Sequence, residues 1–212
     1  GDWWVQDAAA ALPVRLLGDL SGQKALDLCA APGGKTMQLS AAGASTTALD
    51  ISQSRLQRLH ENLDRTGLKA DIIVADARAH GSTDYDVVVL DAPCSATGTI
   101  RRHPDLPFAK DGAQFSALFD LQAQLLDHAL ERMAAHGRLV YCTCSLLPDE
   151  GEAQIENALQ NHPSLRVDHS ALDKDFIAQE WRVAELGLRL RPDFWAEHGG
   201  MDGFFITVLR WA

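Results

Sequence analysis

Residues 87–90 of this 212-residue chain, Val-Val-Val-Leu, constrain its fold more than any other stretch. The run is wholly apolar and mostly β-branched, which suits a strand buried on both faces, as in a parallel sheet covered by helices. The chain can bury a core of this kind, because 46% of its residues are hydrophobic. Together with comparable runs, this stretch predicts strands over 24–29, 45–51, 70–75, 86–90 and 138–143.

Helical patterns separate these strands. In residues 52–65 leucines recur at helical spacing, Ser52 is placed to cap the first turn, and Gly67 follows the last. The arginines of this segment fall on the opposite face, where we expect them to be solvated: Arg55, Arg58 and Arg65. Further helices are predicted over 34–42, 114–135 and 149–160. This alternation predicts an α/β fold with a doubly wound, mostly parallel sheet.

The two ends of the chain carry weaker patterns. Residues 186–190 and 204–209 are predicted to form an antiparallel pair of strands at the C-terminal edge of the sheet. Residues 1–22 show no element and are interpreted as a lead-in to one domain that spans residues 1–212. Because the sequence starts at Gly1 rather than Met, we expect an excised domain with sequence missing upstream.

The four cysteines, at positions 29, 94, 142 and 144, are predicted to be reduced thiols in a cytosolic protein. Cys142 and Cys144 lack the C-x-x-C spacing that is typical of zinc ligands, so they do not suit a zinc site. No apolar run approaches the roughly 18 residues needed to span a bilayer. We therefore expect no metal, no membrane segment and a cytoplasmic location.

A glycine-bearing turn, Pro32-Gly33-Gly34, lies between the first predicted strand and a helix. It allows the backbone to approach a ligand closely and leaves free N–H groups at the start of the helix. Residues 34–36, Gly-Lys-Thr, look like the end of a P-loop, but that motif needs a glycine where Cys29 stands. The stretch does not match the dinucleotide fingerprint either, so the turn alone does not identify its ligand.

Acidic residues end the next three predicted strands, at Asp50, Asp76 and Asp91. Parallel strands bring their carboxyl ends to one edge of the sheet, where doubly wound folds bind their ligands. Aspartates also cap helices that follow strands, and capping alone is the alternative interpretation. Three such acids suit a ligand that carries ribose hydroxyls and a positive charge rather than phosphates. S-adenosylmethionine fits this description.

Two cysteines, Cys94 and Cys144, come directly after predicted strands. The polar neighbours of the second one indicate an exposed site: Thr143 and Ser145. The other two cysteines are expected to be residues of the core or of the backbone around the site. A thiol beside a methyl donor points to covalent catalysis, which requires a thiolate, so a local cation or N–H groups should lower the pKa of the reacting thiol.

Five stretches resemble, in order, the motifs of the RsmB/Sun-type RNA cytosine-5 methyltransferases. They are LDLCAAPGGKT at 26–36, DAPCSATG at 91–98, RRHPD at 101–105, TCS at 143–145 and DGFF at 202–205. The resemblance covers essentially all of residues 3–210. It implies a Rossmann-like class I methyltransferase fold, S-adenosylmethionine as the cofactor, and formation of 5-methylcytosine in RNA, with ribosomal RNA as the expected substrate.

The resemblance also implies roles for individual residues. Cys144 corresponds to the nucleophile that adds to carbon 6 of cytosine, Cys94 to the cysteine that helps expel the enzyme, and Asp91 is expected to hold the ring. The expected cofactor site comprises Cys29, Ala30, Ala31, Pro32, Gly33, Gly34, Lys35, Asp50, Asp76 and Asp91. The expected substrate contacts are Arg101, Arg102 and His103.

Three alternatives stay open. DNA cytosine-5 methyltransferases place their nucleophile in a Pro-Cys element after the same strand, and on that plan Cys94 would attack. The substrate could be tRNA, and the chain could be a catalytically idle scaffold that binds cofactor and RNA. A net charge of −10, from 19 basic and 29 acidic residues, argues against a general polyanion-binding surface. Because family members usually carry an N-terminal RNA-binding region, we expect this domain alone to be a monomer that binds RNA weakly.

Overall fold

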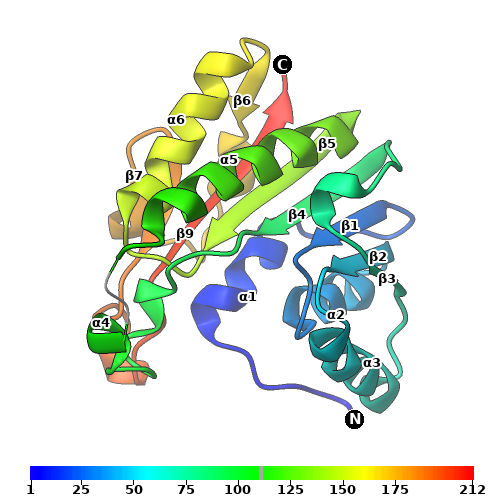
Figure 1. The fold of residues 1–212 in the computed structure, drawn as a ribbon, viewed down its shortest axis with the longest axis horizontal. Coiled ribbons are helices and arrows are strands. Elements are labelled where there is room, and N and C mark those ends of the chain that lie inside the picture. Colours follow the sequence, from blue (N-terminus) through cyan, green and yellow to red (C-terminus); the bar gives the residue numbers. More distant parts are fainter. Residues whose placement is uncertain (110–111) are drawn as a thin grey trace.

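The computed structural model describes residues 1–109 and 112–212. Within these residues one sheet of nine strands runs in the order β3-β2-β1-β4-β5-β9-β8-β7, and β6 also pairs with β9 (Figure 1). The strands are β1 (Lys24–Leu28), β2 (Ser45–Asp50), β3 (Asp71–Val74), β4 (Tyr85–Asp91), β5 (Met133–Thr143), β6 (Leu165–Val167), β7 (Arg182–Val183), β8 (Gly187–Leu190) and β9 (Phe204–Trp211).

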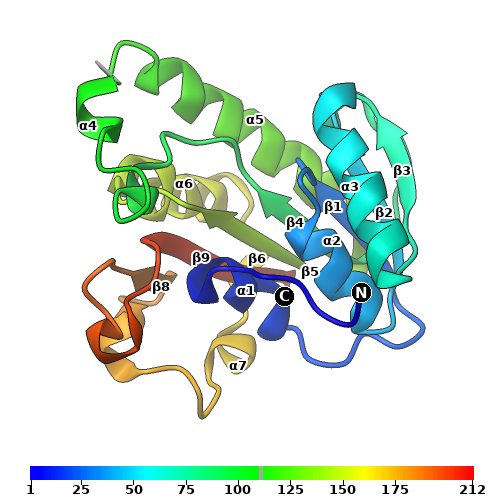
Figure 2. The same cartoon turned by 90° about the horizontal axis from the view of Figure 1, so that it is seen from below.

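Helices cover both faces of this sheet. The first five strands pair in parallel, while β9 runs antiparallel to β5. On β4 and β5, the helices α5 and α6 lie on one face and α1 lies on the other (Figure 2). The predicted doubly wound, mostly parallel α/β sheet is therefore confirmed. The helices are α1 (Ala8–Arg15), α2 (Gly34–Ala41), α3 (Gln53–Thr66), α4 (Leu106–Ala109), α5 (Phe115–Arg132), α6 (Glu152–Asn161) and α7 (His169–Leu172).

Local signals in the sequence explain the middle of the chain. Residues 87–90 of β4 have no exposed surface, as expected for a strand covered on both faces. The helix α3 begins where predicted, because the Ser52 hydroxyl accepts the Arg55 backbone N–H. It ends at Gly67, whose φ of 68° is the left-handed conformation that closes many helices.

The strand β5 begins at Met133, earlier than the predicted start at residue 138. The apolar stripe of α5 continues through Met133, so the pattern alone extends the helix too far. Instead, Met133 pairs with Tyr85, and the register then shifts before Arg138 pairs with Val87. A Cβ at Gly137 would lie 2.8 Å from the Tyr85 carbonyl oxygen, so this glycine permits the irregular pairing inside the strand.

The helix α1 lies in the lead-in, where the sequence predicts no element. Asp7 caps it by accepting the Ala9 N–H at 2.9 Å. Pro13 lies inside the helix and lacks the N–H that a helical hydrogen bond needs, which makes the local pattern unfavourable. Burial of Leu12 and Val14 as α1 packs against α2, β5 and β9 outweighs that local preference.

The predicted antiparallel pair of late strands is present as β8 and β9. However, β9 lies inside the sheet rather than at its edge, because it pairs with β5 on one side and with β6 and β8 on the other. All of its first six residues are buried, as an interior strand requires. Across the described ranges, the helices are too short or too polar to cross a membrane.

Candidate active site

The turn after β1 is fixed to the end of β2. Cys29 and Gly33 both have positive φ, 63° and 106°, which bends the backbone sharply before α2. The Ala30 N–H donates to the Leu49 carbonyl at 2.9 Å. The Ala31 N–H donates to the Asp50 carboxylate at 3.1 Å, so the predicted cofactor turn and the first predicted acid form one unit.

A cavity of about 380 Å³ opens beside this turn, at the carboxyl ends of the parallel strands. From the predicted cofactor site it is lined by Cys29, Ala31, Asp50, Asp76 and Asp91, and both predicted catalytic cysteines, Cys94 and Cys144, line it as well. The other predicted residues of the turn shape it or lie behind the lining; they are Ala30, Pro32, Gly33, Gly34 and Lys35. Seven predicted site residues from separate segments thus line a single cavity.

Asp50 is almost fully buried at the end of β2. Its carboxylate accepts the Ser52 N–H at 2.9 Å in addition to that of Ala31, and the Arg55 guanidinium lies 3.5 Å away. Arg55 also donates to the Ala31 carbonyl. The expectation that Arg55 belongs to a solvated helix face is therefore wrong, because its side chain folds back over the turn and joins the cavity wall. The paired buried charge fixes the orientation of Asp50.

Asp76 caps the short 3-10 turn that follows β3, so the capping interpretation also applies to it. It accepts the Arg78 N–H at 2.9 Å and is bracketed by the Arg78 guanidinium at 3.1 and 2.6 Å. These hydrogen bonds lower the pKa of Asp76 to about 2. Its carboxylate therefore stays ionised at the cavity wall throughout the physiological range.

Asp91 forms an ion pair with Lys35, whose Nζ lies 2.7 Å from Oδ2. Burial opposes a charge on the Lys35 amine, but the Asp91 carboxylate outweighs burial and raises the pKa of Lys35 above its ordinary value. The Lys35 ammonium also lies 5.3 Å from the centre of the Phe204 ring. Lys35 was predicted only as a cofactor-turn residue, and its partnership with Asp91 is a finding of the structure.

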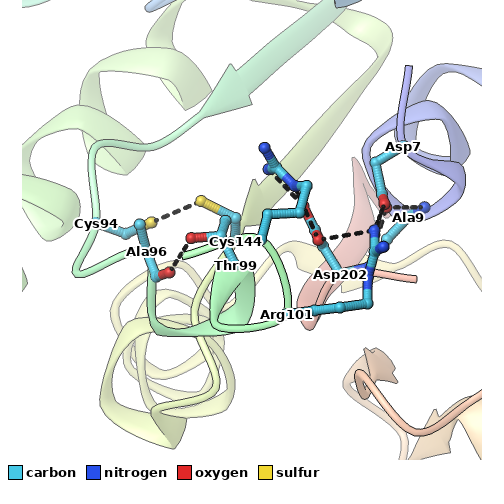
Figure 3. Close-up of polar contacts among 9 residues, drawn as sticks. Asp7, Ala9, Cys94, Ala96, Thr99, Arg101, Cys144 and Asp202 are labelled. Atoms are coloured by element: carbon cyan, nitrogen blue, oxygen red, sulfur yellow. Dashed lines mark hydrogen bonds and ion pairs between the residues drawn. The ribbon is translucent and has the colours of Figure 1, made fainter. Parts of the chain in front are cut away.

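The thiols of Cys94 and Cys144 point toward one another, with 3.5 Å between the sulfur atoms (Figure 3). The hydrogen bond from Cys94 lowers the pKa of Cys144 below its ordinary value, and the same bond raises the pKa of Cys94 well above it. Cys144 is thus the thiol that ionises first, while Cys94 retains the proton. The predicted requirement for a local device that favours a thiolate is met mainly by a second cysteine.

All four cysteines are free thiols. Burial raises the pKa of Cys29 to about 12 and that of Cys142 well above its ordinary value, so neither forms a thiolate readily. Cys142 is fully buried, as predicted, whereas Cys29 is half-buried on the cavity wall. The neighbours of Cys144 do not mark an exposed site, because Thr143 and Ser145 are fully buried and only Cys144 itself reaches the cavity.

The three predicted substrate contacts lie outside the cavity lining. Arg102 donates three hydrogen bonds of 2.6–3.1 Å to Asp202. Arg101 bridges Asp202 at 3.3 Å and Asp7 at 2.8 Å (Figure 3). His103 is exposed. The two arginines therefore tie the cap of α1 to the loop before β9, and a contact with substrate stays a prediction.

Sequence reasoning did not identify several residues of this site. Ile51 lines the cavity with an exposed apolar side chain, and Arg78 closes another part of it. Their positions, one and two residues after predicted acids, were the available signal. Asp7 and the α5 residues Leu121 and Leu125 had no such signal, because only the folded chain brings them here.

Comparisons with known proteins agree with this geometry. The family described as 16S rRNA methyltransferase RsmB/F matches residues 14–210. Ribosomal RNA small subunit methyltransferase B of Cronobacter sakazakii is 44% identical over 170 residues, which are 77% of this chain and 40% of that relative. The chain thus spans about 40% of the length of such curated relatives.

Solved structures show the same fold. The crystal structure of PH0851 superposes with a TM-score of 0.87 at 32% identity, over 98% of this chain and 46% of that one. NSun6 from Pyrococcus horikoshii, solved with SFG, superposes with a TM-score of 0.83 at 26% identity, over 98% of this chain and 53% of that one.

The cavity suits the cofactor that this family uses. Its volume of about 380 Å³ lies within the range of small-molecule sites, roughly 300–1,000 Å³. Its lining combines three carboxylates, each paired with a cation, with the apolar side chain of Ile51, so it can accept hydrogen bonds from hydroxyl and amino groups and contact a flat ring. The chain therefore belongs to the RsmB/F family of 16S rRNA methyltransferases, whose methyl donor is S-adenosylmethionine.

Proposed function

We propose that this chain is the catalytic domain of an enzyme that forms 5-methylcytosine in ribosomal RNA through a covalent bond between Cys144 and the base. The observation that carries the proposal is the pair of facing thiols, Cys94 and Cys144, on the wall of the cavity that also contains Asp50, Asp76 and Asp91. The methyl donor and a pyrimidine would thus meet at one place.

The residues that would hold the cofactor follow from the lining. S-adenosylmethionine supplies an electrophilic methyl group on a sulfonium sulfur. Asp50 ends β2, where doubly wound folds hold ribose hydroxyls, and its neighbour Ile51 offers apolar surface to a purine ring. Asp76 and Asp91 add carboxylates for amino groups, and the ionised carboxylates suit a cationic ligand.

The chemistry begins at Cys144. Carbon 5 of cytosine is a poor nucleophile, but addition of the Cys144 thiolate to carbon 6 forms an S–C6 bond and makes carbon 5 enamine-like. Carbon 5 could then form a bond to the methyl group that S-adenosylmethionine would supply, with S-adenosylhomocysteine as the leaving group. Asp91, oriented by its ion pair with Lys35, is placed to hold N3 or N4 of the ring during this step.

Release requires loss of the proton on carbon 5 together with cleavage of the S–C6 bond. Cys94 or a water that it orients takes this proton. In the resting site the hydrogen bond to Cys144 is the main reason why the pKa of Cys94 is raised. Once Cys144 is a thioether that reason is gone, so the pKa of Cys94 falls toward its ordinary value, Cys94 gives its own proton to solvent more readily, and the resulting thiolate can take the proton from carbon 5.

The substrate assignment follows the family description and the names of the relatives. A target base must be unstacked before it can enter the cavity, so we expect a loop or a remodelled helix of rRNA. The net charge of −10 predicts weak RNA affinity for this domain alone, which we expect to be a monomer. Four free cysteines suit the reducing cytoplasm.

The experiment incubates the protein with labelled S-adenosylmethionine and either unmodified 16S rRNA, tRNA or duplex DNA, and identifies the modified nucleoside by mass spectrometry. We expect 5-methylcytosine in rRNA. Cys144→Ala should abolish transfer without forming any adduct, and Cys94→Ala should accumulate an enzyme–RNA adduct that resists denaturation. The opposite pattern would give the nucleophile role to Cys94, and cofactor binding without transfer to any substrate would support the idle scaffold.

A further inference from the structure

Glu150 has no role in the site described so far, yet its side chain is completely buried directly behind the two thiols. It follows β5 in the 3-10 turn Pro148–Glu150. Among residues 1–109 and 112–212 no lysine, arginine or histidine forms an ion pair with it. Burying a carboxylate without a cation is unfavourable, so its retention calls for a specific purpose.

Donors from two segments surround the Glu150 carboxylate. Oε1 accepts the Ser95 N–H at 2.8 Å and the Gln122 amide at 3.0 Å, while Oε2 accepts the Ser95 hydroxyl at 2.5 Å. The same Gln122 amide donates to the Pro93 carbonyl at 2.9 Å. Glu150 thus fixes the residues on both sides of Cys94, one directly and the other through Gln122.

The backbone of Glu150 holds the opposite loop. Its carbonyl accepts the Tyr141 hydroxyl at 2.8 Å and the Thr143 hydroxyl at 3.3 Å, which anchors the end of β5 just before Cys144. Ser145, just after Cys144, lies 3.1 Å from the Ser95 hydroxyl. One residue therefore connects both cysteine loops, whose sulfur atoms lie 3.5 Å apart.

The charges around the two thiols are unequal. The carboxylate of Glu150 lies on the Cys94 side and adds to the factors that raise the pKa of Cys94, after its hydrogen bond to Cys144 and burial. On the Cys144 side the Asp91 carboxylate, which raises the pKa of Cys144, is paired with the Lys35 ammonium, which lowers it. A carboxylate that forms no ion pair among the described residues lies on the Cys94 side, whereas the carboxylate on the Cys144 side is paired with Lys35, so a shared proton is directed to Cys94.

We propose, on the basis of the proposed function, that Glu150 is a positioning residue that makes Cys144 rather than Cys94 the nucleophile. It does so by fixing the Cys94 loop against β5 and by placing its charge on the Cys94 side of the pair. Glu150 touches neither the base nor the methyl donor in this scheme, so its effect is exerted entirely through the two thiols.

The test measures which thiol is the thiolate, without RNA or cofactor. The folded protein is treated briefly with iodoacetamide near neutral pH, and alkylation at each cysteine is quantified by fragment-ion mass spectrometry, which separates Cys144 from Cys142. In Glu150→Gln the ratio of Cys144 to Cys94 alkylation should fall by about tenfold, which corresponds to a change of about one unit in their relative pKa values.

Gln154→Ala is the matched structural control. In Gln154→Ala this buried residue of α6 loses hydrogen bonds to the Phe119 and Asp149 carbonyls but none to Cys94, Cys144 or Glu150, so the alkylation ratio should equal that of the unmodified chain. If Glu150→Gln is as stable to heat as Gln154→Ala and keeps the original ratio, the proposal is overturned.

Glu150→Asp distinguishes the effect of the carboxylate's charge from the effect of its position. It also tests the proposal if Glu150→Gln does not fold. It keeps the charge but withdraws the carboxylate by one methylene, so the ratio should be retained while kcat for methyl transfer falls by about tenfold with KM for RNA unchanged. An unchanged kcat would overturn the proposal. A chain with the expected ratios that methylates no RNA cytosine would instead refute the proposed function, so the two failures are distinguishable.

Discussion

Asp27 offers a test of how the turn after β1 tolerates a buried acid. This β1 residue has no exposed surface, its Oδ2 accepts the Thr36 hydroxyl at 2.6 Å, and its Oδ1 has no partner among the described residues. Burial raises the pKa of Asp27 from 3.8 to about 7, against the opposing effects of Thr36 and Lys35. The substitution Asp27→Asn keeps the shape and removes the ionisation.

The direction in which stability changes with pH follows from the linkage between proton binding and folding. A carboxyl with a raised pKa binds its proton more tightly in the folded chain, so its contribution to stability is complete below about pH 4 and is lost as the pH rises through about 7. A pKa of about 7 rather than 3.8 corresponds to about 4 kcal/mol of lost stability above that range. The free energy of unfolding of Asp27→Asn should therefore equal that of the original chain at about pH 4 and exceed it by up to about 4 kcal/mol at about pH 8.

The assay is urea unfolding of both proteins at several pH values, with the difference in free energy of unfolding plotted against pH. The other titrating groups contribute equally to the free energy of unfolding of both proteins, so their contributions cancel in this difference. Asp64→Asn, on the exposed face of α3, is the control for the loss of a carboxyl at the surface. A flat difference for Asp27→Asn, or one that makes the variant less stable at high pH, would refute the reasoning.

Three further predictions concern the site and its surroundings. Asp202→Asn removes the buried charge that Arg101 and Arg102 share, and urea unfolding should show a loss of about 2 kcal/mol; no loss would mean that the tie contributes nothing. Cys94→Ala removes the hydrogen bond that lowers the pKa of Cys144, so the pH midpoint of Cys144 alkylation should rise, and an unchanged midpoint would contradict the assignment. The isolated domain should bind rRNA weakly in filter binding at physiological salt, whereas sub-micromolar affinity would show that its charge does not limit binding.

Much of the fold and of the cavity could be predicted from the sequence for one reason. In a parallel sheet every strand delivers its carboxyl end to the same edge, so residues that follow predicted strands meet in space even when their contacts are unknown. Asp50, Asp76, Asp91, Cys94 and Cys144 lie on one cavity because each has that position. The family motifs were recognisable for the same reason, since they are the segments at those strand ends.

Where the sequence pattern failed, the cause was a contact distant along the chain. The Pro13-containing helix α1 and the early start of β5 depend on packing and pairing partners that local periodicity does not encode. Arg55 follows the polar stripe of α3 and yet folds over the turn, because the Ala31 carbonyl and Asp50 are there to receive it.

The sequence by itself determined the class of fold, the edge of the sheet that carries the site, and the residue types assembled there. Only the tertiary structure decided their pairing, namely which cation neutralises Asp91, which thiol retains the proton, and that Glu150 supports both cysteine loops. The physical reason is that a strand end can be located by periodicity, whereas ionisation depends on neighbours within a few ångströms, which come from separate segments of the chain.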